Sequence, residues 1–346
     1  MDAAEIKARA AELGFDLCGI APAAGFRELG FLREWLARGY AGEMGYMERS
    51  AERRADVRAV LPSARSVICL ATIYNTDRPY STEMAGESAA LIARYAWGQD
   101  YHEVIGARME ALLAWMRERA GTELEARAYV DTGPVQERVY AQYAGLGWIG
   151  KNTCVINPEI GSWLFLSEII CNLPLAADPP ALDQCGTCTL CIDSCPTGAI
   201  VEPYVVDATR CLSYLTIELK GEIPIDQRES VGNHAYGCDV CQEVCPWNAQ
   251  PAAPDAPGSP WLPRAVFDGR SLAELWRTPD ADLRAGLKKS AMTRAGVRRL
   301  RRNVAVCAGA TADANALTAL REVHEPTCAD PMVEEHVHWA LELHGG

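Results

Sequence analysis

The chain reads Cys185-Gly-Thr-Cys188-Thr-Leu-Cys191-Ile-Asp-Ser-Cys195-Pro196 in one stretch and Cys238-Asp-Val-Cys241-Gln-Glu-Val-Cys245-Pro246 in another, with Cys211 upstream of the second. The C-x2-C-x2-C-x3-C-P spacing is typical of bacterial proteins with two [4Fe–4S] clusters, in which the fourth cysteine of each block binds the cluster of the other block. The short steps let three thiolates converge on one cluster, and the three-residue step carries the fourth away. The spacing predicts a ferredoxin-like domain that transfers electrons one at a time.

This rule assigns four cysteines to each cluster. We expect one cluster to be held by Cys185, Cys188, Cys191 and Cys245, and the other by Cys195, Cys211, Cys238 and Cys241. Zinc is the alternative, because C-x2-C pairs also build zinc ribbons, but zinc sites rarely place Cys-Pro after a three-residue step in both blocks. The other six cysteines are expected to be mostly buried, inert thiols: Cys18, Cys69, Cys154, Cys171, Cys307 and Cys328.

Length and composition limit the class of protein. With 346 residues, 49% of them hydrophobic, the chain is expected to form two or three globular domains. No stretch approaches eighteen uninterrupted apolar residues, so neither a membrane-spanning helix nor a membrane partner is expected. The chain shows no signal sequence, which favours a reducing cytoplasm over a disulfide framework.

Charge is unevenly distributed along the chain. The net charge of −13 argues against nucleic-acid binding by the whole surface. Residues 264–302, however, contain eleven Lys and Arg residues against four acids, a local balance of +7. This basic island is a candidate phosphate-binding face, and a solvated helix surface is the alternative.

Residues 1–178 have the pattern of an α/β domain. Residues 66–74 form a continuous apolar run with β-branched residues, which predicts a strand buried on both faces. Further strands are predicted at 126–131 and 163–170, and helices at 2–14, 104–119 and 135–143. Alternating strands and helices indicate an α/β fold.

Two further parts follow. Residues 179–250 are expected to form the ferredoxin-like domain, with 26 residues (212–237) between Cys211 and Cys238 where a plain ferredoxin has two. This insertion is either surface decoration or a contact with the α/β domain or a ligand. Residues 251–346 are expected to contain a stiff, proline-rich linker over 250–263 and then helices at 272–276, 297–307, 314–323 and 332–343, the pattern of a HEAT-like segment.

Asp131 is the candidate catalytic carboxylate. It ends a predicted strand in the turn Asp131-Thr-Gly-Pro134, and ligands of α/β sheets gather at the carboxyl ends of strands. In a pocket beside a bulky apolar cofactor, its pKa would rise and it could act as a general acid. The alternative is a structural role as the N-cap of the helix that follows.

Several ordered motifs resemble those of the epoxyqueuosine reductase family. They run from about residue 10 to 250 and more faintly to the end of the chain. The motifs are Glu52-x-Arg54-x-Asp56, Arg94-Tyr-Ala-Trp-Gly-x-Asp-Tyr-His102, Tyr129-Val-Asp-Thr-Gly-Pro-Val, Gly145-Leu-Gly-Trp-Ile-Gly-Lys-Asn-Thr-Cys, Ile156-Asn-Pro-Glu-Ile-Gly-Ser-Trp and Tyr236-Gly-Cys-Asp-Val-Cys-Gln-Glu-Val-Cys-Pro-Trp-Asn.

The resemblance implies an activity and a set of site residues. It implies cobalamin in the α/β domain, two [4Fe–4S] clusters, and reduction of epoxyqueuosine to queuosine at the wobble position of tRNA with electrons from a low-potential donor. Asp131 matches the family's proton donor. The positions expected around the cobalamin are Arg54, Arg94, Lys151, Asn152, Ser213 and Asp239, and those expected to meet the tRNA anticodon stem-loop are Lys220, Arg294 and Arg298.

A corrinoid bound through a lower histidine ligand uses a D-x-H-x-x-G motif. The sequence Asp100-Tyr-His102-Glu-Val-Ile-Gly106 misses this motif by one residue and has a helical context, so the cobalamin is expected to lack a histidine ligand. Two alternatives remain open. The first is a reductive dehalogenase-like corrinoid enzyme, although such enzymes usually carry a twin-arginine export signal. The second is an electron-transfer or tRNA-binding module without catalysis of its own.

Overall fold

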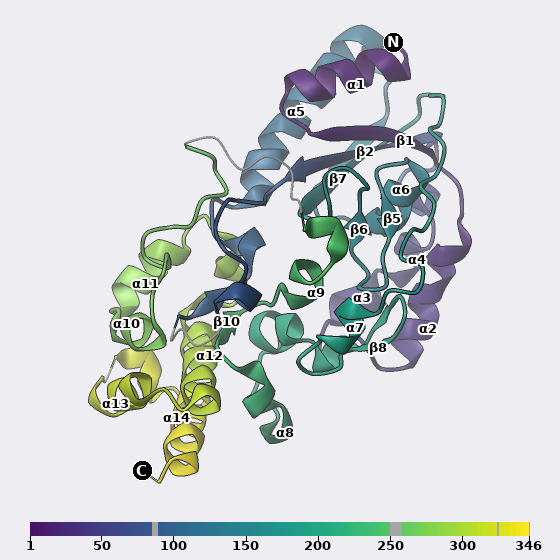
Figure 1. Cartoon of the computed structure of the whole chain (residues 1–346). Helices are drawn as coiled ribbons and strands as arrows, with labels where there is room; N and C mark the ends of the chain where they lie inside the picture. The colour runs from purple at the N-terminus through teal and green to yellow at the C-terminus, as the bar shows by residue number, and fades with distance from the viewer. Residues whose placement is uncertain (85–88, 250–257, 324, 346) are drawn as a thin grey trace.

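A four-stranded antiparallel sheet forms the centre of the N-terminal part (Figure 1). The computed structural model describes residues 1–84, 89–249, 258–323 and 325–345, so most of the predicted proline-rich linker lies outside the described residues. Every neighbouring pair in the sheet is antiparallel. The strand order is β1 (Leu17–Pro22), β2 (Ser66–Ile73), β7 (Leu164–Cys171) and β4 (Ala126–Tyr129). The sequence predicts three of these strands and misses β1.

Helices cover both faces of this sheet. Alternate residues of β2 point to opposite faces, and all of them up to Thr72 are buried, which confirms the predicted strand at 66–74. Ile68 and Leu70 belong to the core under α1 (Ala3–Glu12) and α5 (Tyr101–Ala120), whereas Cys69 belongs to the core under α6 (Glu137–Tyr143). Three short helices lie between β1 and β2 in the chain: α2 (Phe31–Ala37), α3 (Gly45–Arg49) and α4 (Ala51–Arg54).

Short elements build the cysteine-rich part. The turns α7 (Leu190–Asp193) and α9 (Val240–Glu243) belong to the two cysteine blocks and pack against each other. Small two-stranded sheets surround them. These are β5 (Trp148–Ile149) with β6 (Val155–Ile156), β8 (Ile200–Glu202) with β9 (Val205–Val206), and β3 (Leu91–Ile92) with β10 (His234–Tyr236).

The C-terminal part is helical and lies away from the large sheet (Figure 1). Helix α12 (Gly296–Thr311) is at its centre and is buried along most of its length. Around it pack α10 (Leu272–Arg277), α11 (Asp280–Leu287), α13 (Ala314–Glu322) and α14 (Pro331–Leu343). The sequence predicts four of these five helices and misses α11.

The insertion at 212–237 belongs to the same core as α12. It contains α8 (Ile225–Arg228) and a π-helical turn at Tyr214–Glu218. Nine of its apolar side chains are buried with the C-terminal helices: Leu212, Tyr214, Leu215, Ile217, Leu219, Ile223, Val231, Ala235 and Tyr236. Surface decoration is therefore the wrong interpretation of this segment.

Two of the eleven cations of the basic island are internal. Arg301 and Arg302 are 1% and 0% exposed, although the charge count treats them as surface cations. Arg302 Nη2 donates to Leu215 O at 2.6 Å, and Nη1 donates to Leu219 O at 2.9 Å and to Gly221 O at 2.6 Å. These carbonyls lie in and after the π-helical turn, where the backbone leaves acceptors without helical partners. The local balance of +7 therefore overestimates the phosphate-binding surface.

Replacing Arg302 with alanine is expected to destabilise the fold by about 3 kcal/mol or more, because several buried carbonyl groups would lose their donor. Chemical unfolding of the two proteins measures this difference. Arg298→Ala is the matched control on the same helix. Arg298 is half-exposed and pairs with Asp330 at 2.8 Å, so its loss should cost about 1 kcal/mol or less. Equal effects of the two substitutions would contradict the buried role of Arg302.

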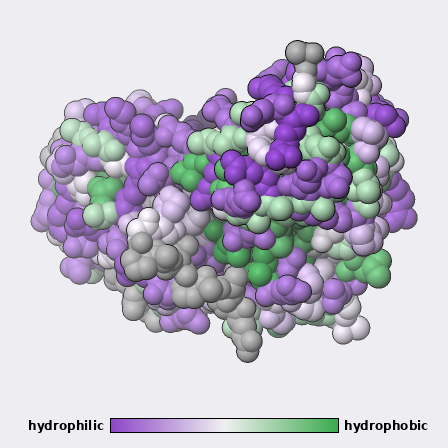
Figure 2. Space-filling model, turned by 90° about the horizontal axis from the view of Figure 1, so that it is seen from above, coloured by the Kyte–Doolittle hydropathy of each residue, from purple (hydrophilic) through white to green (hydrophobic). Residues whose placement is uncertain are grey.

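The helices of the described ranges show no membrane-spanning segment. None of the helices there combines the length and the apolar character that crossing a bilayer requires. The face shown in Figure 2 is mostly hydrophilic, and hydrophobic residues show in patches between the polar ones.

Candidate functional site

The seven cysteines of the two blocks and Cys211 form two groups in space. Burial and then the neighbouring thiols of Cys245, Cys185 and Cys188 raise the pKa of Cys191 to about 11. Cys245, from the second block, therefore lies with three cysteines of the first.

In the second group, Cys195 of the first block lies with cysteines from the later part of the chain. Burial raises the pKa of Cys238, and the nearby thiols of Cys211 and Cys195 add to this shift. The hydrogen bond to Cys154 and burial raise the pKa of Cys241, and the nearby thiols of Cys238 and Cys211 add to this shift. Among the residues that the structure describes, no three His, Cys, Asp or Glu side chains are arranged to hold a single metal ion. Two groups of four thiols are the arrangement that a pair of [4Fe–4S] clusters needs.

The segment around β5 and β6 connects the α/β domain to both cysteine groups. Lys151 Nζ donates to Gly186 O at 2.7 Å and to Cys188 O at 2.9 Å, and Asn152 Nδ2 donates to Cys241 O at 3.0 Å. The hydrogen bond between Cys154 and Cys241 lowers the pKa of Cys154, so this thiol is not isolated as the sequence suggests. Lys151 and Asn152, two of the predicted cofactor positions, thus hold the cysteine-bearing loops in place.

Asp131 lies in the tight loop between β4 and α6. Its backbone has φ +57°, in the left-handed region that only glycine, asparagine and aspartate adopt readily. The same loop needs a glycine at Gly133, where an added Cβ would come within 2.3 Å of the Tyr129 ring. Helix α6 begins only at Glu137, and no side chain caps it. The alternative that Asp131 is a helix cap is therefore wrong.

Two side chains from the start of α5 contact one oxygen of Asp131. Tyr101 Oη donates a 2.8 Å hydrogen bond to Asp131 Oδ2, and His102 Nε2 lies 3.7 Å from the same atom. His102 holds the pKa of Asp131 below its usual range, and Tyr101 acts in the same direction, against the effect of burial. The raised pKa expected for a pocket is not what the structure gives, because the side chain is 57% exposed and has partners that favour its charged form.

Groups from the other parts of the chain surround Asp131. The charges of Glu218, Arg294, Asp131 and Arg54 all act on the phenol of Tyr46, where burial and Glu218 raise the pKa most strongly. Arg294 pairs with Glu218 at 2.5 Å and lies 5.5 Å above the Tyr46 ring. Three predicted site residues, Arg54, Asp131 and Arg294, are thereby brought together from α4, the β4–α6 loop and the C-terminal part.

Other predicted site residues have internal contacts or lie elsewhere. Arg94 is 2% exposed and donates to the carbonyls of Thr76, Arg78 and Pro79. Its backbone N–H donates to Asp239 at 2.6 Å, and burial raises the pKa of Asp239 to about 7.

The last three predicted positions lie on the insertion and on α12. Ser213 hydrogen-bonds to the thiol of Cys211, where burial is the main cause of a raised pKa. Lys220 is exposed and its backbone N–H donates to Glu43, while Arg298 is paired with Asp330. The structure therefore places Lys220 and Arg298 at the surface, and Ser213 beside a cysteine ligand.

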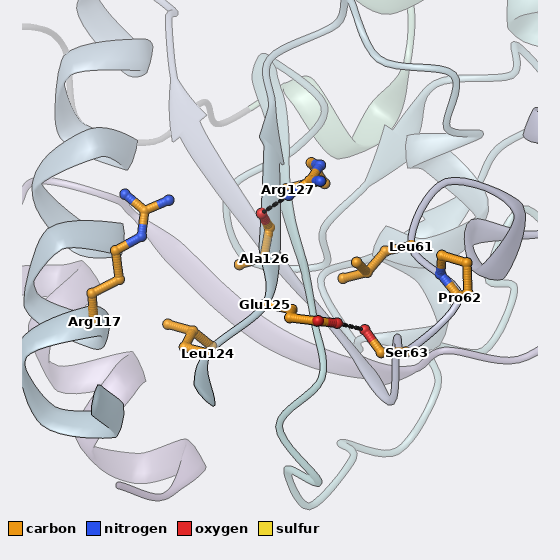
Figure 3. A pocket seen from close by; sticks show the side chains of 8 residues that line it. All are labelled: Leu61, Pro62, Ser63, Arg117, Leu124, Glu125, Ala126 and Arg127. Carbon is orange, nitrogen blue, oxygen red and sulfur yellow. Dashed lines mark hydrogen bonds between the residues drawn. The ribbon is translucent and has the colours of Figure 1, made fainter. Parts of the chain in front are cut away.

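A hollow of about 480 Å³ lies at the other end of β4 (Figure 3). It is lined by Leu61, Pro62, Ser63, Arg117, Leu124, Glu125, Ala126 and Arg127. Glu125 accepts a hydrogen bond from Ser63, and Arg127 donates to the carbonyl of Ala126. Because Ala126 begins the strand and Asp131 follows its end, this hollow is separate from the candidate site.

Comparison with known proteins identifies the family. The chain is 40% identical over 346 residues to an epoxyqueuosine reductase from Xanthomonas campestris pv. campestris, which covers 99% of this chain and 96% of that protein. The chain belongs to the epoxyqueuosine reductase family. A family member from Gloeobacter violaceus is 44% identical over 323 residues, covering 90% of this chain and 97% of its own. A crystal structure of epoxyqueuosine reductase with an epoxyqueuosine-modified tRNA-Tyr stem loop matches with a TM-score of 0.88 and 30% identity, covering 99% of this chain and 90% of that one.

Two family models agree with this placement. The model described as "Epoxyqueuosine reductase QueG, DUF1730" matches residues 54–132, which contain Arg54, Arg94 and Asp131. The model described as "4Fe-4S double cluster binding domain" matches residues 184–248, which contain all eight cysteines of the two groups. The chain thus carries the domain for two [4Fe–4S] clusters, and zinc is the wrong interpretation of its cysteine spacing.

Sequence reasoning missed several residues that lie close to Asp131 in the candidate site. Tyr101 and His102 directly follow Asp100, the N-cap of α5. The signal that could have indicated these two residues is an aromatic pair in the first turn of a long helix. Glu137 begins α6 and Glu168 lies in β7, and the charge of Asp131 acts on both of them. Burial, followed by the charge of Asp131, raises the pKa of Glu137 to about 8. Burial also raises the pKa of Glu168 well above its usual range, and Glu137 and Asp131 add to this.

Glu168→Gln is expected to stabilise the protein more at pH 7.5 than at pH 5. Glu168 is 1% exposed, and its Oε1 has no hydrogen-bond partner among the described residues. The folded state keeps the proton while the unfolded state ionises above about pH 4.5, so wild-type stability falls by up to about 1.4 kcal/mol per pH unit over that window.

Chemical unfolding of wild type and Glu168→Gln at both pH values tests this expectation. Glu110→Gln, an exposed position on α5, is the control and should give the same difference from wild type at either pH. A Glu168→Gln effect that does not change with pH would contradict the raised pKa.

Proposed function

We propose that this protein reduces epoxyqueuosine to queuosine at the wobble position of tRNA. Membership of the epoxyqueuosine reductase family over nearly the whole chain carries this proposal. The site supports it, because Asp131 is half-exposed, held by two side chains of α5, and surrounded by groups from three parts of the chain. Asp131 would donate the proton to the epoxide oxygen as the carbon–oxygen bond breaks.

The cysteine-rich domain would supply the electrons. Opening and deoxygenating an epoxide takes two electrons, and each [4Fe–4S] cluster carries one at a time. The reciprocal grouping of the cysteines supports crosswise ligation, with Cys245 completing one cluster and Cys195 the other. Lys151 and Asn152 would keep both clusters at a fixed place relative to the α/β domain.

Cobalamin is the cofactor that we propose for the α/β domain, without a histidine ligand. The residues present fit such a group. Asn75 Oδ1 and Glu168 Oε1 are buried acceptors without a partner in the described part of the chain, and the amide side groups of a corrin ring can donate to such oxygens. His102 already has carboxylates at both ring nitrogens. When bound, cobalamin would supply strongly reducing chemistry at the carbon–oxygen bond. The candidates for its contacts are Arg54, Arg94, Lys151, Asn152, Ser213 and Asp239.

The tRNA anticodon stem-loop is the proposed partner surface. Arg294 is half-exposed and lies near Asp131, which suits a contact with the phosphates flanking the reacting nucleotide. Lys220 and Arg298 would extend this contact along the insertion and α12. We assign the domains as 1–178 for the cofactor, 179–250 for the clusters, and 251–346 for a HEAT-like helical part that supports tRNA binding.

A turnover assay tests the function. The full chain, loaded with cobalamin and reduced with dithionite, is incubated with an anticodon stem-loop RNA that carries epoxyqueuosine. Nucleoside mass spectrometry should show queuosine, with one oxygen atom fewer than the substrate. A protein that accepts electrons but forms no queuosine would overturn the proposal and favour the electron-transfer module instead.

A further inference from the structure

A histidine held between two carboxylates is the part of the site that the proposed reaction has not yet used. His102 Nδ1 lies 2.7 Å from Asp100 Oδ1, and His102 Nε2 lies 3.7 Å from Asp131 Oδ2. The imidazole is 34% exposed, so it touches both solvent and the candidate acid. The imidazole therefore lies between the solvent and Asp131.

The local structure fixes the position of the imidazole. Asp100 is the N-cap of α5 and accepts a 3.0 Å hydrogen bond from the His102 backbone N–H, while its side chain also faces Nδ1. The Tyr101 ring stacks on the His102 ring at 4.0 Å and on the Phe165 ring at 4.4 Å. Two consecutive side chains of one helical turn therefore lie close to the same oxygen of Asp131.

The proposed reaction needs more protons than Asp131 alone can carry. Converting an epoxide to an alkene and water consumes two electrons and two protons. One proton goes to the oxygen as the first carbon–oxygen bond breaks. The second goes to the same oxygen as the other carbon–oxygen bond breaks and water leaves. Asp131 carries one proton at most, so it must receive another within each turnover.

The charges of the pair show where a proton rests. The pKa of His102 is raised: burial lowers it, but the carboxylates of Asp131 and Asp100 together outweigh that effect. The pKa of Asp131 is lowered, chiefly by His102. A proton shared by the two groups therefore favours the imidazole over the carboxylate.

We propose that the Asp100–His102 pair is a proton relay that reloads Asp131 from solvent and so provides both protons of the reduction. This inference rests on the proposed function, which sets the need for two protons. His102 acts through Asp131 and is a positioning and relay residue. Asp100 orients the ring and stabilises its charged form, as a carboxylate does for a histidine base in other enzymes.

Other charged groups face this pair and must be separated from it in a pH experiment. From α6, Glu137 acts on His102 and Arg138 acts on Asp131. From the C-terminal part, Arg264 lies near Asp100 and Glu103, and Lys289 Nζ lies 3.8 Å from Glu103. Glu137 is the group most easily confused with His102, because burial raises its pKa to about 8, so Glu137 also titrates within the pH range of the experiment. Glu137→Gln is therefore included as a variant.

The first test needs no turnover. Histidine labelled with carbon-13 in the imidazole ring is titrated by NMR in the full chain, and the His102 signal is assigned by its loss in His102→Gln. We expect His102 to titrate above 6.5 in wild type and to move down in both Asp131→Asn and Asp100→Asn. An ordinary titration that neither substitution alters would overturn the proposal, whatever the enzyme does.

The second test compares kcat and KM for the epoxyqueuosine stem-loop between pH 5.5 and 9. His102→Gln should lower kcat by about 10- to 100-fold with little change in KM, and it should lose the alkaline limb that wild type and Glu137→Gln share. Imidazole in the buffer should restore part of the kcat of His102→Ala. The control is His338→Gln, at an exposed position of α14, which should behave as wild type.

The outcomes distinguish a failure of the proposed relay from a failure of the proposed function. If wild type forms queuosine and His102→Gln keeps its kcat and its pH profile, the relay is overturned while the proposed function stands. A lowered kcat that imidazole cannot restore, with an unchanged pH profile, means a structural role only and also overturns the relay. If wild type forms no queuosine, the function itself fails, and the NMR result then reports only the static pairing.

Discussion

Asp131→Asn is expected to lower kcat for queuosine formation by about 100-fold or more, with KM for the stem-loop nearly unchanged. Asparagine keeps the size of the side chain and can occupy the same loop conformation, but it has no acidic proton for the epoxide oxygen. Its amide also removes the charge that His102 and Tyr101 stabilise. Steady-state kinetics under dithionite measures the effect, and the visible spectrum of the clusters should not change.

Glu125→Gln is the matched control for this experiment. Glu125 immediately precedes β4, at the hollow shown in Figure 3, whereas Asp131 follows the end of the same strand. Loss of this carboxylate should leave kcat within about twofold of wild type, because surface substitutions away from a site have small effects. Full activity of Asp131→Asn would remove the assignment of Asp131 as the acid and leave the reaction itself in place.

Cys245→Ala is expected to remove one of the two clusters and to abolish turnover. The iron content should fall from about eight to about four atoms per chain, because a [4Fe–4S] cluster needs four thiolates. Electrons would then have no continuous path to the site. Iron and sulfide analysis, together with EPR of the reduced protein, gives the number of clusters. Cys328→Ala, outside both cysteine groups, should retain about eight iron atoms.

Double substitutions test the crosswise pairing directly. Cys245 is expected to share its cluster with Cys188, so the Cys245→Ala, Cys188→Ala protein should still hold about four iron atoms. Cys238 belongs to the other group, so combining Cys245→Ala with Cys238→Ala should leave almost none. The reverse pattern would show that each block binds its own cluster and would contradict the assignment.

The strands and helices that the sequence predicts correctly are those with a strong apolar pattern. β2 and β7 are long and buried, and α5, α12 and α14 have clear boundaries, so their existence follows from residue pattern alone. Helix α11 lacks such a pattern. The direction of the strands could not be predicted, because an antiparallel sheet with helices on both faces has the same local pattern as a parallel one.

The residues of the candidate site could be predicted only where a local sequence pattern indicates their role. The spacing of the cysteines predicts their grouping, and Asp131 lies in the loop that directly follows a predicted strand. The role of the basic island was not predictable, because Arg301 and Arg302 have the sequence pattern of surface cations and are buried by tertiary contacts. The pairing of Asp100, His102 and Asp131 depends on the packing of α5 against the sheet, which joins residues thirty positions apart.

The contact between α12 and the insertion has a consequence for how this protein matures. Synthesis on the ribosome releases Cys211, the insertion and Cys238 before the arginines of α12 exist. Until Arg299 and Arg302 arrive, the carbonyls of the π-helical turn lack their donors, and the apolar side chains of the insertion lack a core. Stable assembly of the second cluster is therefore expected to wait until α12 has been made, and a chain that stops before α12 is expected to reach the iron–sulfur machinery without a folded second site.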